Sequence, residues 1–292
     1  MHNQKLSYIY ALSAVLLWST VATAFKVALG FLSPLKLLLF SSFVALFFLT
    51  LRIIWQNKTK EAFRYLQKNF LLTFFQGVIN PFLYYLVLFK AYDLLPAQEA
   101  QAINYTWALT LSYLSVIFLK QKLSFYDLIA GFLAYFGVLI IATKGEILSL
   151  HFSNSFGVSL ALFSTILWSF YWIINTKAKA DPTIALFSNF LVGSLFILLY
   201  SIYQGIDFSI SLKPFLATLY IGLFEMGITF LLWLNALKYA KNTSKTANLI
   251  FLSPILSLFF IHIIVGEKIE NSTIVALGFI LFGLSLQKLK SK

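Results

Sequence analysis

Glu225 is the ionisable residue that stands out in this sequence, because it lies in the middle of the apolar segment 214–237. It is about 11 residues into that segment, which corresponds to about 16 Å along a helix. An ionisable group at this depth in a membrane is costly and is a functional candidate by default. A carboxyl there can exchange a proton or bind an amine. The alternative is a neutral glutamate that hydrogen bonds between helices.

Two asparagines also interrupt apolar segments. Asn80 lies in the middle of 70–91 and is followed by Pro81, which removes a backbone hydrogen bond and leaves a carbonyl available to line a cavity. Asn104 lies in the segment 95–118, which has an unusually polar start. Either asparagine can instead make an ordinary hydrogen bond between helices.

Aromatic residues supply candidate walls for a cavity around these polar groups. Tryptophan and tyrosine also collect in packing and at membrane interfaces, so each has a structural alternative. The candidate cavity residues are Trp18, Asn80, Tyr84, Asn104, Trp107, Trp168, Trp172 and Glu225.

Lys26 and Glu99 lie near the ends of their apolar segments, where the entrance to such a cavity is expected. Lys26 is a candidate cation for a ligand carboxylate, although a lysine can also simply extend its ammonium group to the interface. Glu99 follows Pro96, so it can instead complement the N-terminus of a helix.

The composition indicates which class of protein must position these residues. Of 292 residues, 60% are hydrophobic and 11% charged, against about 45–50% and about 25% in soluble domains. The mean hydropathy of +0.85 therefore indicates a polytopic membrane protein. The absence of cysteine excludes disulfides and thiolate sites. The three histidines, His2, His151 and His262, are far apart, so we expect no metal site and no cofactor.

Ten apolar segments are each about long enough for a membrane helix. They are 7–28, 32–53, 70–91, 95–118, 125–143, 155–175, 184–204, 214–237, 243–265 and 271–288. The longest connection, Arg52 to Asn69, is expected to be a short polar loop. The first segment contains Ala22-Thr23-Ala24, which matches a cleavage pattern, but its length favours an uncleaved first helix.

The lysines and arginines indicate the orientation of these helices. With the N-terminus inside, 16 of the 22 basic residues lie on the inner side. Basic residues concentrate in cytoplasmic loops, so both termini are expected in the cytoplasm. The membrane that the chain crosses is expected to be the cytoplasmic (inner) membrane. The net charge of +12 is therefore a signal of topology, and we expect no nucleic-acid partner.

The two halves of the chain, 1–150 and 151–292, resemble each other weakly. The tripeptide Leu-Trp-Ser at 17–19 recurs at 167–169. Further matches at offsets of 145 and 146 pair Gly77 with Gly222, Ala91 with Ala236, Lys122 with Lys268, Ala130 with Ala276, and Gly137 with Gly283. A repeat of five helices is inverted in the membrane because five is odd. Inverted repeats are typical of secondary transporters, whose substrate site lies at the midplane between the repeats.

The chain also resembles the EamA-type permeases of the drug/metabolite transporter superfamily over its whole length. Leu17-Trp18-Ser19 resembles the N-terminal signature of that family, and Ser253-Pro254 with Gly266-Glu267 resembles its proline-containing helix. The run 104–108, Asn-Tyr-Thr-Trp-Ala, is similar to a motif of the aromatic amino-acid exporter branch, which has proline where this chain has Ala108.

The pattern and the resemblance together predict an all-α integral membrane protein with ten transmembrane helices in two inverted five-helix repeats. The resemblance implies a secondary transporter that exports a small metabolite, an amino acid or related compound, by alternating access. Its partners would be the substrate, a proton or other ion, and the lipid bilayer. An importer or facilitator is the alternative within transport. A lipid-modifying membrane enzyme and a non-transporting receptor are the alternatives of other classes, but the sequence has no P-loop, HExxH or DDxxD motif.

Overall fold

The computed structural model describes residues 3–120, 125–149, 154–175, 181–241, 246 and 248–289. These residues form helices and their connections, without strands, so the all-α prediction is confirmed for them. Three residues named in the predictions above lie outside the described ranges: His2, His151 and Lys122. The same holds for five of the basic residues counted on the inner side: Lys177, Lys179, Lys245, Lys290 and Lys292.

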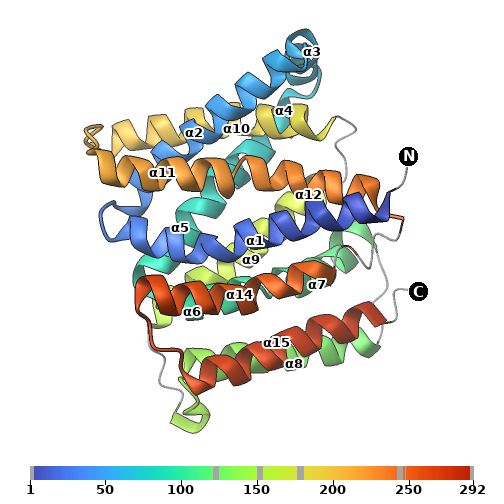
Figure 1. The fold of residues 1–292 in the computed structure, drawn as a ribbon, viewed down its shortest axis with the longest axis vertical. Coiled ribbons are helices and arrows are strands. Elements are labelled where there is room, and N and C mark those ends of the chain that lie inside the picture. The colour runs from blue at the N-terminus through green and yellow to red at the C-terminus, as the bar shows by residue number, and fades with distance from the viewer. Residues whose placement is uncertain are drawn as a thin grey trace.

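The helices of the first half cover each apolar segment predicted there, as Figure 1 shows. They are α1 (Gln4–Leu29), α2 (Pro34–Trp55), α3 (Thr59–Lys68), α4 (Phe70–Gly77), α5 (Tyr84–Leu94), α6 (Ala97–Asn104), α7 (Trp107–Leu119) and α8 (Phe125–Ala142). The π-helical turn η1 (Val78–Leu83) joins α4 to α5.

The second half has a similar succession of helices. They are α9 (Ser155–Asn175), α10 (Pro182–Tyr203), α11 (Leu212–Phe224), α12 (Ile228–Tyr239), α14 (Leu252–Phe260) with the π-helical turn η4 (Ile261–Val265), and α15 (Asn271–Leu289). In the described part of the chain, seven helices are long and apolar enough to cross a membrane, and three apolar helices are shorter. The shorter ones are Leu128–Ala142, Leu252–Val265 and Asn271–Leu286.

Local sequence sets where several of these helices begin. Asn3 accepts a hydrogen bond from the backbone N–H of Leu6, and Ser33 precedes Pro34 at the start of α2. Asp181 caps α10 in the same way and is followed by Pro182. A capping side chain satisfies one of the free N–H groups of the first turn, and proline is suited to the first helical position.

The prediction of a polar loop between Arg52 and Asn69 is wrong, because α3 occupies most of that connection. Ala62 of α3 is buried against Ile53 of α2 and Ile184 of α10. Most of its other residues are polar or charged, so the average hydropathy of the segment is that of a loop. Its contact with α2 and α10 stabilises the helix in this connection.

Three of the predicted segments are interrupted near their middles. Asn80 has extended backbone angles inside η1, with φ −139° and ψ 117°. The second break lies at Tyr105 and Thr106, between α6 and α7, and the third at 225–227, between α11 and α12. Non-helical backbone at membrane depth is tolerated where it is buried in protein or lines a cavity. The breaks therefore mark the interior of the molecule where a site is expected.

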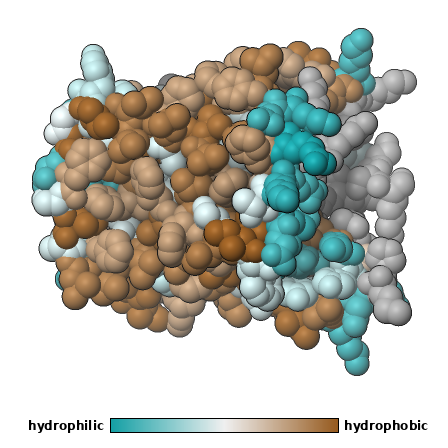
Figure 2. Space-filling model, turned by 90° about the horizontal axis from the view of Figure 1, so that it is seen from above, coloured by the Kyte–Doolittle hydropathy of each residue, from teal (hydrophilic) through white to brown (hydrophobic). Residues whose placement is uncertain are grey.

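The helices are arranged in layers (Figure 1). Helices α2 and α10 pack together at one edge of the view, and α8 and α15 form a pair at the opposite edge. Between them lie α1 and α9, on which the broken helices pack. Figure 2 shows that the face above α2 and α10 is largely hydrophobic, with hydrophilic residues gathered towards one end. A wide apolar surface of this kind suits contact with lipid.

Candidate functional site

Glu225 lies at the break between α11 and α12 and is 9% exposed. The hydroxyl of Tyr85, on α5, donates a hydrogen bond of 3.0 Å to its Oε1 atom. The indole of Trp18, on α1, is a second donor next to the same carboxyl. Gly227 precedes α12 with φ −116° and ψ −86°, which is not helical. The break thus places one carboxyl between donors from two other helices.

An aromatic cluster surrounds this carboxyl and joins the two halves of the chain. Phe230 of α12 contacts Trp18 of α1 at 5.8 Å and Trp168 of α9 at 5.9 Å between ring centroids. Tyr84 stacks on Trp168 at 4.6 Å and contacts the ring of Tyr85 at 4.8 Å. Tryptophans from the matching tripeptides of the two halves therefore meet through one phenylalanine.

The second break brings Asn104 and Trp107 to the same cluster. Asn104 donates a hydrogen bond of 3.0 Å to the hydroxyl of Ser164 on α9 and lies beside Tyr84. Trp107 contacts Trp168 and Trp172, each at 6.4 Å between centroids. Seven of the eight predicted cavity residues therefore lie in or next to one cluster.

The eighth, Asn80, is fully buried in η1, where it lies beside Tyr171. Offset 145 also pairs Asn80 with Glu225, which predicts that the two face each other across the repeat. Their neighbours in the structure differ: Asn80 lies beside Tyr171, and Glu225 accepts its hydrogen bond from Tyr85. Tyr171 contacts Trp168 at 5.4 Å, so Asn80 is linked to the cluster through one intervening ring. Gly193 of α10 packs directly against the ring of Pro81, so that any larger residue at this position would collide with it.

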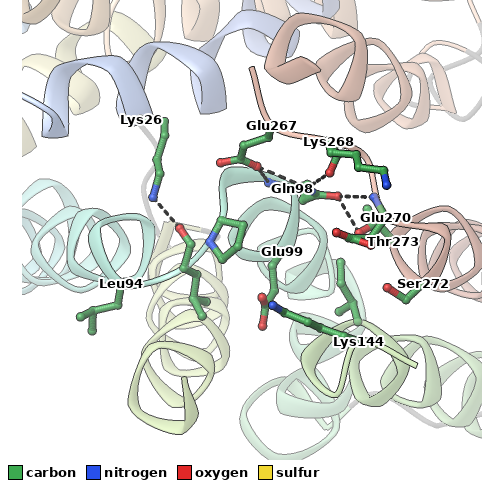
Figure 3. Close-up of a pocket in the computed structure, with 13 residues that line it drawn as sticks. Lys26, Leu94, Gln98, Glu99, Lys144, Glu267, Lys268, Glu270, Ser272 and Thr273 are labelled. Carbon is green, nitrogen blue, oxygen red and sulfur yellow. Dashed lines mark hydrogen bonds between the residues drawn. The ribbon is translucent and has the colours of Figure 1, made fainter. Parts of the chain in front are cut away.

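Lys26 and Glu99 line a separate cavity of about 420 Å³ at the end of the helices, shown in Figure 3. The ammonium group of Lys26 donates to the backbone carbonyls of Tyr92, at 3.0 Å, and Leu95, at 2.7 Å. Those carbonyls belong to the C-terminal end of α5, where a cation is favourable. Lys26 therefore has a structural role at the wall of this cavity, in addition to its charge.

The rim of this cavity depends on two residues that were not predicted as site residues, Gln98 and Glu267. The carboxylate of Glu267 accepts hydrogen bonds from the backbone N–H of Ala97, at 2.8 Å, and of Gln98, at 3.3 Å, so it caps α6 from another part of the chain. The side chain of Gln98 donates to the carbonyl of Lys268 at 2.9 Å and accepts from Thr273 at 2.7 Å. The motif Gly266-Glu267 points to Glu267 in the sequence. The sequence does not show that Glu267 caps α6, because α6 is distant from it in the chain.

The charges around this cavity are mixed. Three basic and three acidic residues line it: Lys26, Lys144, Lys268, Glu99, Glu267 and Glu270. In Figure 3 the side chain of Lys144 extends towards Glu99. A cavity lined by charges of both signs suits a zwitterionic ligand better than an ion of one sign.

Comparison with known proteins identifies similar chains. The model of the EamA-like transporter family matches residues 5–143 and residues 155–287. An 18% identical protein of known crystal structure superposes with a TM-score of 0.69 and covers 98% of both chains, which shows a shared fold.

Three relatives are described as uncharacterized transporters. One from Clostridium kluyveri is 27% identical over 172 residues, 56% of this chain and 55% of that protein. One from Archaeoglobus fulgidus is 23% identical over 284 residues, 92% of this chain and 94% of that protein. YoaV of Bacillus subtilis is 22% identical over 280 residues, 94% of this chain and 93% of that protein.

Proposed function

The chain belongs to the EamA-like transporter family and is a multi-pass membrane protein, and we propose that it exports an amino acid or related small metabolite across the cytoplasmic membrane by alternating access. The observation that carries this proposal is the position of Glu225, a single carboxyl at a helix break inside an aromatic cluster contributed by both halves. Discontinuous helices at the midplane typically form the binding site of secondary transporters. The aromatic amino-acid exporter branch remains a prediction.

The proposal includes ten transmembrane helices in two inverted repeats, residues 1–150 and 151–292. Two pairs of reciprocal contacts support it. A Cβ on Gly137 would lie 2.7 Å from the carbonyl of Ala276, and a Cβ on Gly283 would lie 2.6 Å from the carbonyl of Ala130. These four residues are two of the pairs matched at offset 146. Gly137 therefore meets Ala276 and Gly283 meets Ala130, so exchanging the two halves exchanges the two contacts. A pseudo-two-fold axis requires this reciprocity.

The matched pair Gly77 and Gly222 behaves in the same way. A Cβ on Gly77 would lie 2.7 Å from the carbonyl of Asn189 on α10, and one on Gly222 would lie 2.5 Å from the carbonyl of Ser41 on α2. In the proposed repeat, α10 is the counterpart of α2. The glycine of each half therefore packs against the backbone of a helix from the other half.

Within the proposed cavity, Glu225 takes up a proton or the amine of the substrate, and the surrounding aromatic rings pack against the apolar part of the substrate. Aromatic faces also attract cations, which adds to the attraction for an amine. The cavity with mixed charges at Lys26 and Glu99 is the outer entrance, where a zwitterionic amino acid meets both signs of charge.

The orientation is tested with reporter tags. Because most basic residues lie on one side, tags at Lys58 and Lys292 are expected to report the cytoplasm and a tag at Glu146 the opposite side. A cytoplasmic tag at Glu146 would contradict the inverted arrangement, since an odd number of helices must separate the halves.

The transport role is tested by replacing Glu225 with glutamine, which keeps the shape but removes the titrating proton. A metabolite screen of cells lacking and overproducing the protein first supplies the substrate. In proteoliposomes, Glu225→Gln is expected to retain substrate exchange but to lose accumulation driven by a pH gradient. Loading substrate on either side distinguishes export from import.

The matched control is Glu146→Gln, which removes an exposed carboxyl that is not part of the aromatic cluster and should leave both activities intact. A Glu225→Gln protein that accumulates substrate with the pH dependence of the unmodified chain would show that the carboxyl is structural. Absence of flux in the unmodified protein, with any metabolite identified by the screen, would contradict the transport proposal itself.

A further inference from the structure

The helix α3 has one face that the rest of the protein covers. Ala62 is 2% exposed and packs against Ile53 and Ile184, while Tyr65 is partly buried beside the same contact. The ammonium group of Lys58, immediately before α3, lies 2.7 Å from the carboxylate of Asp181. Apolar packing and an ion pair therefore hold α3 against α10 in one orientation.

The opposite face of α3 is basic and exposed. Lys60, Arg64 and Lys68 follow one another at intervals of four residues, which places them along one side of a helix. All three are exposed, and none of the ion pairs found in the described residues involves them. The segment from Arg52 to Lys68 contains five basic residues and one acidic residue, Glu61.

Large apolar side chains on and beside α3 are also exposed. Trp55 at the end of α2 is 74% exposed, and the guanidinium of Arg52 lies 4.7 Å from the centroid of its ring. Phe63 on α3 is 62% exposed, and Leu71, which follows in α4, is 70% exposed. Figure 2, viewed from the side where α3 lies, shows a hydrophilic band next to a broad hydrophobic surface. Aromatic and basic residues meet in this way at the boundary between lipid chains and headgroups.

We propose that α3 is an interfacial helix that binds the headgroups of anionic lipids through Lys60, Arg64 and Lys68. Phe63 and Trp55 lie at the level of the acyl chains, and the basic side chains reach the phosphates beside them. Because the other face of α3 packs on α2 and α10, the lipid binds to a helix that is held in place by both halves of the chain. The occupant is the bilayer on which the protein sits, because the basic stripe and the exposed apolar side chains are adjacent and both need partners.

The absence of cysteine allows a single fluorescent probe to be attached at Gln67→Cys, an exposed position on α3. The labelled full-length protein is placed in nanodiscs that contain brominated phosphatidylglycerol or, at equal mole fraction, brominated phosphatidylcholine. We expect stronger quenching by the anionic lipid, and we expect the difference to shrink as the salt concentration rises.

The test variant is Lys60→Gln with Arg64→Gln and Lys68→Gln. Each basic residue near an anionic surface contributes roughly a fivefold change in binding, so this variant should lower the preference for phosphatidylglycerol by more than about tenfold. The control carries the same loss of charge at three other exposed residues of the side proposed to be cytoplasmic, Lys5→Gln, Lys238→Gln and Lys241→Gln, and should keep the preference.

Equal quenching by the two lipids in the unmodified protein would overturn the proposal, whatever the variants do. A preference that does not depend on salt would also overturn it. Loss of the preference in the control variant would show a general effect of net charge in place of a site on α3.

Discussion

Replacing Gly137 with alanine tests the packing of α8 against α15 directly, because the added Cβ would meet backbone of the partner helix. The added Cβ would lie 2.7 Å from the carbonyl oxygen of Ala276, 3.0 Å from Cγ1 of Ile280 and 3.2 Å from Cβ of Phe279. Ordinary contacts of a Cβ begin at 3.4 Å. The two helices must therefore separate by about 0.7 Å, because the nearest atom belongs to backbone and cannot rotate away.

Overpacking of this kind costs about 1–3 kcal/mol, and α8 packs mainly against α15, so most of the cost should appear as lost stability. The measurement is thermal unfolding of the purified protein in detergent, followed by intrinsic fluorescence. Gly278→Ala, on α15, is the control, because no atom lies within 4 Å of its added Cβ. It should be neutral or slightly stabilising, since alanine favours a helix more than glycine does.

Gly283→Ala should have the same effect, because its Cβ would lie 2.6 Å from the carbonyl of Ala130. Either substitution already forces the helices apart, so the double variant should lose less stability than the sum of the two single losses. The reasoning is refuted if Gly137→Ala unfolds at the same temperature as Gly278→Ala. It is equally refuted if the double variant shows full additivity.

Two further predictions concern the charged ends of helices. Partial burial opposes ionisation of Asp181, but hydrogen bonds from Lys58 and from the backbone N–H of Thr183 outweigh it, so the pKa of this carboxyl is lowered. A lowered pKa in the folded protein means that the contribution of Asp181 is complete above its ordinary pKa of about 4 and is lost as the pH falls through the lower folded value. Asp181→Asn should therefore lower the stability of the protein by about 1 kcal/mol or less at neutral pH, as measured by thermal unfolding. The difference from the unmodified protein should vanish in acid. A difference that grows in acid would contradict this prediction. Glu267→Ala should lower stability by about 1–2 kcal/mol, because two backbone N–H groups at the start of α6 lose their acceptor. Glu270→Ala is the control and should lower stability less in the same assay. Equal losses in the two variants would refute the capping role of Glu267.

Much of the fold could be predicted from the sequence because apolarity is a property of each segment by itself. A helix in lipid must satisfy its own backbone hydrogen bonds and be apolar over about 20 residues, so the segments are visible without knowledge of their neighbours. The matched glycines were visible for a related reason. A position where two backbones approach closely tolerates only a small side chain, so glycine or alanine stands at the matched positions of the two halves.

The polar residues of the candidate site could be predicted as a set, but their partners could not. Glu225 stood out because a carboxyl is costly in an apolar segment. The packing of α5, α9 and α12 around α1 decides which groups the site residues meet. It brings the hydroxyl of Tyr85 to the carboxyl of Glu225, and it places Phe230 between Trp18 and Trp168. The spacing of residues within one helix contains no information on which helix lies opposite.

The sequence by itself determined the membrane class, the number and rough extent of the apolar segments, and the polar positions inside them, because these follow from transfer of each segment between water and lipid. Only the tertiary structure decided that 59–68 is a helix, that Glu267 caps α6, and that Lys26 caps α5. Each of these depends on a contact between residues that are distant in the chain. Such a contact forms only when the packed helices bring a donor and an acceptor, or two apolar faces, to the same place.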